Sequence, residues 1–448
     1  MKKRNDRFLA LIYILGVSLM LILRDLQGVA ISKFIILAFA LAVLAMAQYE
    51  TMVQMVSFTL PLVCGLPGTY LMLGALLLLI FKRKRINFWQ LGSIAFIVIA
   101  EVVASLWYPR LDVIAIVNYI SFAGIVFFLI HDSEELDFQE CIQRYLYGTA
   151  LLLAVIVIST LQTAPRNWLD SFARGMFRFG QEHVGNEQEM VLLLNANSMA
   201  YYSVVGMACG VFLAERKKGF WRIFNIAAVV FFAAAGFLTL SRSWLLVVAI
   251  CMLLYIFSKL RSPKQFLAMS LVLVVVFTAG SIYLQQHPEL TAGFLARLTD
   301  DTVETGGGRE NLFIDYMEAF FAQVRFILMG TGVTQYHSQT QIYESMHNGT
   351  QQILVCYGII GFIVFMTSLI RSVVSTKGTK GKKRDVVRYL PLIAVVLFVQ
   401  TIQFLNPNML MLPFIIGVYA VKAGGQSNED LSYYSGHRGG QPLEVEAR

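Results

Sequence analysis

Charged residues are scarce in this chain of 448 residues, since Asp, Glu, Lys and Arg make up only 14% of it while 57% is hydrophobic. Soluble globular domains carry about 25% charged residues, so the composition excludes an ordinary soluble domain. Continuous apolar runs recur along the chain, and runs of roughly 17 to 25 residues have the length that a helix needs to cross a bilayer. The composition therefore predicts a polytopic membrane protein.

The apolar runs also lack the alternation of apolar and polar residues that marks the strands of a membrane barrel. Because backbone groups within hydrocarbon must be hydrogen-bonded internally, a continuous apolar run is expected to cross as a helix. The predicted fold class is all-α: a polytopic transmembrane helix bundle of about 12 to 14 spans with one larger external loop subdomain.

The predicted spans are residues 8–23, 29–47, 52–66, 67–81, 88–107, 112–130, 145–162, 195–214, 221–239, 243–258, 265–284, 350–371, 388–405 and 408–421. The first follows Lys2-Lys3-Arg4 without a small-residue cleavage site, so we expect it to be retained. Proline and glycine interrupt residues 52–81, which can be two short spans or one broken helix.

Cysteine is rare and scattered, with five residues at positions 64, 141, 209, 251 and 356. Neither these nor the His, Asp and Glu residues have metal-ligand spacing, so we expect no structural disulfide and no metal centre. A Walker-type loop and a serine-nucleophile motif are missing as well.

The net charge of +8 is gathered in short loops between the predicted spans. Basic clusters at residues 2–7, 82–85, 216–218, 259–264 and 377–388 fall on one side of the membrane if the spans above are counted, and the positive-inside rule makes that side cytoplasmic. We therefore expect both termini in the cytoplasm and no nucleic-acid partner. Residues 1–422 form one transmembrane domain with long external loops at 163–194 and 285–349, and residues 423–448 form a disordered cytoplasmic tail.

Arginine is unexpected on the outer face, yet several arginines are predicted there. Arg242 lies at the tip of a hairpin between two spans, Arg309 follows Gly306-Gly307-Gly308, and Arg174 and Arg178 lie four residues apart in the first long loop. Guanidinium groups bind phosphate oxygens in a bidentate way and keep their charge, so these residues suit a polyanion such as a lipid diphosphate. The alternatives are headgroup contact for Arg242 and a solvated loop position for Arg309.

The residues after the glycine triplet have helical periodicity, with apolar side chains forming one stripe between Arg309 and Gln323. A helix that begins at Gly308 would direct its positive end toward the same anion. An amphipathic helix of this kind can instead simply pack on the bundle or lie in the interface.

Two histidines lie near the end of the second long loop, at His337 and His347. Imidazole has an ordinary pKa near neutrality, so His347 could take a proton from a sugar hydroxyl that attacks as a nucleophile. The alternative is a structural histidine at the membrane boundary.

Several short blocks together resemble the O-antigen ligase and polysaccharide polymerase family. They are His347-Asn348 with Gln352, Leu354 and Gly358-Ile359-Ile360-Gly361; Leu240-Ser241-Arg242-Ser243-Trp244-Leu245-Leu246; Gly308-Arg309 followed by Gly330-Thr331-Gly332; and Asn195-Ala196-Asn197-Ser198-Met199-Ala200, in which Ala196 replaces the proline of the family pattern. The blocks keep the family order and cover roughly residues 170–370.

The resemblance implies a GT-C-like integral membrane glycosyltransferase with a metal-independent, inverting mechanism and no cofactor. The donor would be a glycan on undecaprenyl diphosphate at the external or periplasmic face of the bacterial plasma (inner) membrane. Arg242 and Arg309 would stabilise the diphosphate leaving group, and His347 would be the base. The expected substrate-binding residues are Arg174, Arg178, Asn197, Ser241, Gly308, His337 and Asn348.

The family contains polymerases, which extend a lipid-linked chain of capsule, exopolysaccharide or O-antigen repeats, and ligases, which transfer a finished glycan to lipid A core or another acceptor. The external loop at residues 163–194, with Arg166, Arg174 and Arg178, could hold a second lipid diphosphate, which favours a polymerase. A chain-length regulator protein is then a candidate partner beside the membrane lipids. A flippase for lipid-linked oligosaccharides is the alternative from another class, for which Glu101 and Asn118 would be mid-membrane polar residues. A peptidoglycan polymerase of similar architecture would need an external acidic residue that no motif places.

Overall fold

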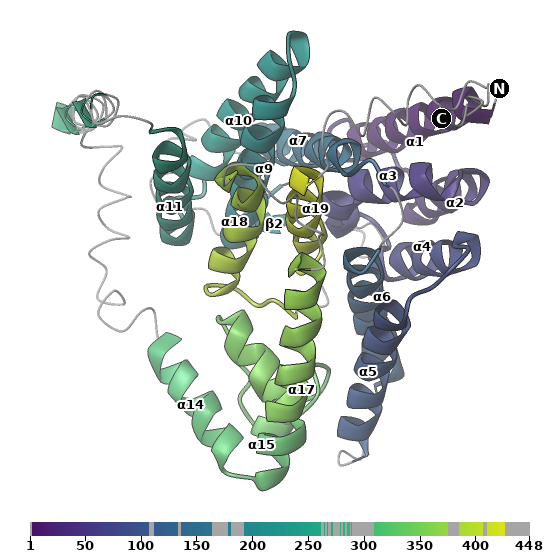
Figure 1. The fold of residues 1–448 in the computed structure, drawn as a ribbon, viewed down its shortest axis with the longest axis vertical. Coiled ribbons are helices and arrows are strands. Elements are labelled where there is room, and N and C mark those ends of the chain that lie inside the picture. Colours follow the sequence, from purple (N-terminus) through teal and green to yellow (C-terminus); the bar gives the residue numbers. More distant parts are fainter. Residues whose placement is uncertain are drawn as a thin grey trace, which may run out of the picture.

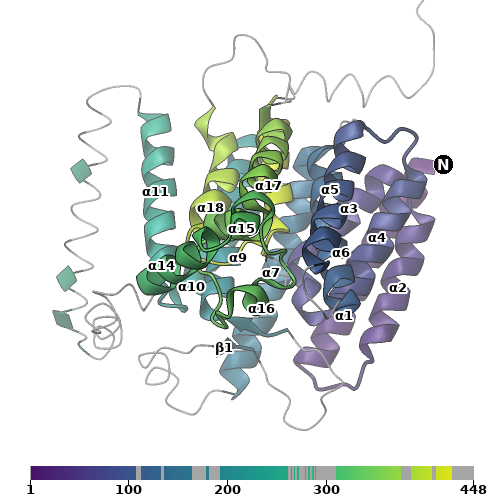
Figure 2. The ribbon, with the colours of Figure 1, turned by 90° about the horizontal axis from the view of Figure 1, so that it is seen from below.

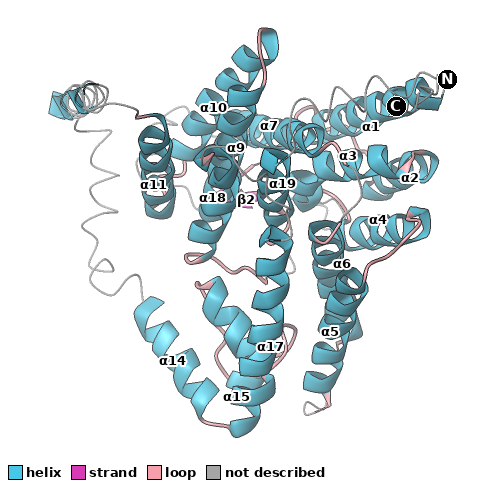
Figure 3. Cartoon of the chain, in the orientation of Figure 1, coloured by secondary structure: helices cyan, strands magenta, loops and turns pink. Residues whose placement is uncertain are grey.

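The computed structural model describes residues 2–106, 112–132, 136–163, 178–180, 192–260, 309–374, 385–405 and 410–425, together with scattered helical residues between 264 and 288. Within these ranges, eight helices are long and apolar enough to cross a membrane, and four shorter helices are also apolar. Helices account for most of the described chain (Figure 3). The predicted all-α, polytopic fold is confirmed.

The first third of the chain contributes a layer of antiparallel helices. These are α1 (Lys2–Asp25), α2 (Lys33–Met46), α3 (Tyr49–Thr59), the 3₁₀ helix η1 (Leu60–Gly65), α4 (Gly68–Lys82), α5 (Phe88–Ser105) and α6 (Val113–Ile130). The interrupted stretch at 52–81 is two short helical segments, because α3 passes into η1, with Pro61 in its first turn, and the chain turns at Leu66 before α4. A proline has no backbone N–H, which makes a helix start the position where it costs least.

The middle of the chain forms the helices α7 (Phe138–Thr163), α9 (Ala196–Arg216), α10 (Phe220–Phe237) and α11 (Arg242–Lys259). Small residues let these helices approach one another closely, as they commonly do in membranes. A Cβ at Gly148 of α7 would lie 2.0 Å from the carbonyl oxygen of Phe58 in α3, and one at Gly210 of α9 would lie 2.6 Å from the side chain of Val229 in α10. Strand β1 (Arg178–Phe179) pairs antiparallel with β2 (Leu194–Asn195), directly before α9.

The last third contains both amphipathic and spanning helices: α14 (Arg309–Phe321), α15 (Val324–Met329), α16 (Tyr336–Thr340), α17 (Gly349–Val374), the 3₁₀ helix η4 (Val386–Tyr389), α18 (Leu390–Val399) and α19 (Pro413–Gly425). The helix predicted from Arg309 is confirmed as α14.

Two predicted boundaries differ from the structure. The span predicted at 388–405 ends earlier, at Val399, and α19 extends past the predicted start of the tail to Gly425. Most of the predicted span at 265–284, the glycines 306–308 and residues 426–448 lie outside the described part.

Helix α17 is broken inside its apolar run, at Gly358, where φ is +65°. The break would leave carbonyl groups of the preceding turn without intrahelical partners, and in a membrane such groups must be satisfied by protein. The amides of Thr331 and Gly332 provide this, donating to the carbonyls of Val355 (3.1 Å) and Cys356 (2.8 Å). A side chain at Gly358 would overlap the backbone of Leu328, at 2.5 Å. Glycine is therefore required where α17 meets the end of α15.

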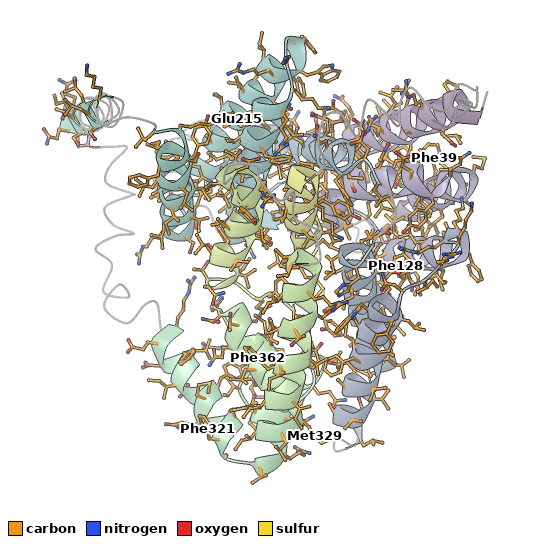
Figure 4. The ribbon with its side chains drawn as sticks, viewed as in Figure 1. Phe39, Phe128, Glu215, Phe321, Met329 and Phe362 are labelled. Atoms are coloured by element: carbon orange, nitrogen blue, oxygen red, sulfur yellow. The ribbon has the colours of Figure 1, made fainter. Side chains whose placement is uncertain are left out.

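Helices α14, α15 and the lower part of α17 form one extremity of the molecule (Figure 1). Phe321 and Met329, at the C-terminal ends of α14 and α15, lie at its lower edge (Figure 4) and are 63% and 49% exposed. Seen along the other direction, β1, α14 and α16 lie toward the end of the bundle opposite the connection between α4 and α5 (Figure 2). The loop elements that carry the predicted site thus gather toward one end of the bundle.

The other end of the bundle is held by buried polar contacts. Arg83 donates to Asp132 at 2.6 Å, and both residues are buried. Lys422 of α19 donates to the carbonyls of Ile130 (2.7 Å) and Asp132 (2.8 Å). Ser368 of α17 contacts the ring nitrogen of His131 at 2.7 Å. These contacts join the ends of α4, α6, α17 and α19.

Candidate active site

The hairpin between α10 and α11 places Arg242 at the first residue of α11. Ser241 caps this helix, its hydroxyl accepting from the amide of Trp244 (3.5 Å), and the indole of Trp244 donates to the hydroxyl of Ser203 in α9 (3.0 Å). Gly236 makes room for the indole, because a Cβ there would lie 2.1 Å from the indole nitrogen. The hairpin is thus packed firmly on α9, and Arg242 projects from it as an exposed side chain.

The start of α9 lies against the same hairpin. Asn195 caps α9 by accepting from the amide of Ser198 (2.7 Å), and the hydroxyl of Ser241 donates to the side-chain oxygen of Asn197 (3.4 Å). The register of the short sheet pairs the backbone of Arg178 with that of Asn195. Asn197 and Ser241 are therefore brought together, with the backbone of Arg178 beside them. The side chain of Arg178, as well as Arg174 and Gly308, falls outside the described part of the structure.

The first turns of α14 and α17 are joined to each other. Asn348 caps α17, since its side-chain oxygen accepts from the amide of Gln351 (3.0 Å). The side chain of Gln351 in turn donates to the carbonyl of Phe313 in α14 (2.8 Å). His347 immediately precedes the cap and Arg309 is the first residue of α14. The two helix N-termini, each the positive end of a helix dipole, therefore lie in one place.

A pocket of about 180 Å³ lies at this junction. Its lining consists of Arg309, Glu310, Leu312, Phe313, His347, Asn348, Gln351 and Gln400. Of the two predicted reactive residues in it, Arg309 is half-buried and His347 is exposed. Within the described ranges, no group of three or more His, Cys, Asp or Glu side chains is arranged to hold a metal ion. The pocket therefore presents to a ligand the guanidinium of Arg309, the imidazole of His347 and nearby side-chain amides.

Charge couples the three residues expected to be catalytic. Partial burial and the nearby charge of Arg242 lower the pKa of Arg309, but a guanidinium remains charged at neutral pH after any modest shift. Loss of part of its hydration and the charge of Arg309 lower the pKa of His347 below the usual 6.5, and Glu344 partly offsets this. At pH 7 the imidazole of His347 is therefore neutral and able to accept a proton. Arg309, next to it, remains positively charged at this pH.

His337 is not in the pocket lining. Its Nδ1 contacts the carbonyl oxygen of Ile342 at 2.7 Å, and the hydroxyl of Tyr316 lies 3.4 Å from the same nitrogen. Tyr316 also donates to the carbonyl of Glu344 at 2.6 Å. These contacts hold the loop that leads into His347. His337 therefore stabilises that loop and does not line the pocket.

Sequence reasoning did not select three of the polar residues that line the pocket. Gln351 lies one helical turn after His347, so helical periodicity could have found it. Glu310 is the neighbour of Arg309 in the sequence. Gln400 reaches the pocket from the end of α18, where its side chain accepts from the hydroxyl of Thr350 (3.0 Å). Nothing in its apolar surroundings in the sequence distinguishes it.

Comparison with known proteins bears directly on this arrangement. Residues 227–366 match the family model described as O-antigen ligase. This segment, which is less than half of the chain, is therefore similar to the O-antigen ligase family. A search among curated proteins found no match. The O-antigen ligase segment contains Arg242, Arg309 and His347, whereas Asn197 and Gln400 come from helices on either side of it.

Proposed function

We propose that this protein is a glycosyltransferase that polymerises oligosaccharide repeat units carried on undecaprenyl diphosphate, at the outer face of the bacterial plasma membrane. The observation that carries the proposal is the placement of His347 and Arg309 in one pocket at the N-termini of α14 and α17. Partial desolvation and the charge of Arg309 lower the pKa of His347, which favours the neutral imidazole. The similarity of residues 227–366 to the O-antigen ligase family model supports the same activity.

In the proposed reaction an acceptor sugar hydroxyl attacks the anomeric carbon of the donor glycan. The new C–O bond forms as the bond to the diphosphate breaks, and the leaving lipid diphosphate takes the electron pair. His347 accepts the hydroxyl proton. Arg309 and Arg242, with the positive ends of α14 and α17, stabilise the charge that develops on the diphosphate. A single displacement of this kind inverts the anomeric configuration and needs no metal.

A cationic loop between α7 and α9 favours polymerisation over ligation. A polymerase must hold two lipid diphosphates, one on the donor and one on the acceptor. Arg166, Arg174 and Arg178 belong to the loop before α9, and the backbone of Arg178 is paired with Asn195, next to the contact between Asn197 and Ser241. We propose this loop as the acceptor side. Transfer to lipid A core or another separate acceptor, with a single diphosphate site, is the alternative.

A transporter function has less support from the same contacts. The polar residues that a flippase could use in mid-membrane are already engaged: Glu101 accepts from Val333 (2.7 Å), and Asn118 accepts from Thr69 (2.5 Å). Both contacts join these side chains to other segments of the bundle.

The test is to incubate the purified full chain with an undecaprenyl-diphosphate-linked repeat unit and separate the products by size. A ladder of products supports a polymerase, transfer only to an added separate acceptor indicates a ligase, and no consumption contradicts both. Arg242→Ala, Arg309→Ala and His347→Ala should each abolish the ladder. Arg222→Ala, which removes an exposed arginine at the start of α10, is the matched control and should leave it intact.

A further inference from the structure

Glu101 is a fully buried carboxylate in the last turn of α5, at 0% exposure. Its Oε1 accepts from the amide of Val333 at 2.7 Å, and its Oε2 accepts from the amide of Thr334 at 3.3 Å and from the Thr334 hydroxyl at 2.9 Å. Three donors are directed at this one carboxyl group, so both of its oxygens act as acceptors. Both oxygens are therefore engaged by the loop between α15 and α16, and Glu101 lies outside the pocket and outside the matched segment.

The segment Gly330–Thr334, which we term the anchor loop, is bound on two sides. On one side, its Thr331 and Gly332 amides satisfy the carbonyls exposed by the break in α17. On the other, its next two amides donate to Glu101. Four consecutive amides of the anchor loop are thus satisfied, two by α17 and two by one side chain of α5.

The contact between the anchor loop and α5 is close enough to require glycine. Gly332 has φ +75°, and a Cβ there would lie 2.7 Å from the Cβ of Ala104 and 3.3 Å from Oε2 of Glu101. One turn further on, the side chain of Gln335 donates to the hydroxyl of Ser105 at 3.1 Å. The end of α5 therefore serves as a platform on which the loop lies.

The anchor loop is connected to the segments on both sides of His347. Downstream of it, α16 and residues 341–346 lead into His347, and Tyr316 of α14 holds that path by its bond to the Glu344 carbonyl. On the far side of His347, the first half of α17 runs down to the break at Gly358, against which the anchor loop is bonded. Movement of the loop away from α5 would shift His347 relative to Arg309.

We propose that Glu101 is a positioning residue for the transfer reaction: it binds the anchor loop to α5 and so holds His347 at its working distance from Arg309. This inference rests on the proposed function. Through Glu101, the first third of the chain would then contribute to the reaction, although the reactive residues all lie in the second half. Glu101 does not touch the substrate, so its effect passes entirely through the loop.

The test compares the full chain with Glu101→Gln, which keeps the size of the side chain but presents an amide to the loop donors. Hydrogen exchange at the amides of Val333 and Thr334 should become faster. The kcat for transfer should fall about 10- to 100-fold with little change in KM, because misplacement by about 1 Å can cost 10²-fold. The acid limb of the pH–rate profile should move to higher pH, since His347 leaves the field of Arg309 that lowers its pKa.

The control is Ser93→Ala, which removes a buried hydroxyl from the same helix at its other end, bonded to Ser368 at 2.9 Å. It should change neither the exchange nor the pH profile. Thr334→Val is a milder second variant that removes only the hydroxyl bond to Glu101, and it should shift the profile in the same direction by less. This variant keeps the test decisive if Glu101→Gln does not fold.

Unchanged hydrogen exchange at Val333 and Thr334 in Glu101→Gln would show that Glu101 does not hold the anchor loop, and would overturn the proposal. A lower kcat with an unmoved acid limb would mean a general structural role, and would overturn the positioning role while the proposed function stands. If the wild-type chain consumes no lipid-linked donor, the proposed function and the positioning role both fail. Hydrogen exchange does not depend on activity, so it would still show whether Glu101 holds the amides of Val333 and Thr334.

Discussion

The proposed reaction requires His347 to be neutral while Arg309 stays charged, and the charge of Arg309 favours the neutral imidazole. The charge of Arg309 disfavours the imidazolium form and lowers the pKa of His347. A neutral imidazole is in turn the form that can accept a proton from a sugar hydroxyl. The pair is thus suited to accept a proton at neutral pH.

Removal of the imidazole tests this pair directly. His347→Ala should lower the rate of transfer by about 10² to 10⁴-fold, the usual contribution of a general base. Donor binding should change little, because the arginines remain. The rate is measured with purified protein and lipid-linked donor, and the His337→Ala variant serves as comparison. A His347→Ala enzyme with wild-type rate would remove His347 from the mechanism.

The geometry of Arg309 is tested by a substitution that keeps the charge. Arg309→Lys should reduce kcat/KM by about 10- to 100-fold, equivalent to loss of one charged hydrogen bond, because an ammonium group cannot make the bidentate contact with phosphate oxygens. Equal activity of the lysine variant would show that only net charge matters at this position.

The pH dependence follows from the lowered pKa of His347. The active form is the neutral imidazole, so the rate should be constant at neutral pH and fall as the pH drops through a pKa below 6.5. Glu344 raises this pKa, so Glu344→Gln should move the acid limb to still lower pH and leave the plateau unchanged. The measurement is a pH–rate profile of both proteins. A shift of the limb to higher pH would contradict the electrostatic account.

At the scale of elements, the broken helix α17 is what allows a loop to reach the interior of the bundle. Gly358 adopts a positive φ and leaves two carbonyls that the anchor loop satisfies. Gly330 and Gly332, both at φ +75°, give the loop the complementary shape. The motif therefore requires glycine at three positions for reasons of backbone geometry and close packing.

Gly358→Ala should destabilise the protein by more than backbone strain alone. Positive φ costs a residue with a Cβ about 1–2 kcal/mol, and here the Cβ would also overlap the backbone of Leu328. Gly219→Ala is the control, since its φ is +58° but nothing lies within 4 Å of the added atom. Thermal unfolding in detergent should show a larger loss of Tm for Gly358→Ala. Equal losses would mean that the packing at the break contributes nothing.

At the scale of the whole molecule, the two ends of the bundle are held differently. The end with the pocket is held by capped helix N-termini and the anchor loop, whereas the other end is held by the buried contact of Arg83 with Asp132 and by Lys422. The helices between them are packed through apolar side chains and glycine contacts.

The buried ion pair is expected to dominate the stability of that end. Asp132→Ala would leave Arg83 buried without its carboxylate, at a cost of about 3–5 kcal/mol. Glu215→Ala is the control, because its pair with Lys259 is 31% and 43% exposed and such pairs contribute about 0–1 kcal/mol. Unfolding of both variants in detergent measures the difference. Similar losses would mean that Arg83 finds other partners.

The sequence by itself determined the membrane class, most helix positions, α14 and the selection of Arg242, Arg309 and His347, because hydropathy, helical period and short motifs are local properties of the chain. Only the tertiary structure decided that Gln400 joins the pocket, that His337 supports a loop, and that Glu101 holds the anchor loop. Glu101 and Val333 are 232 positions apart. Their contact depends on how helices pack, which no local pattern records.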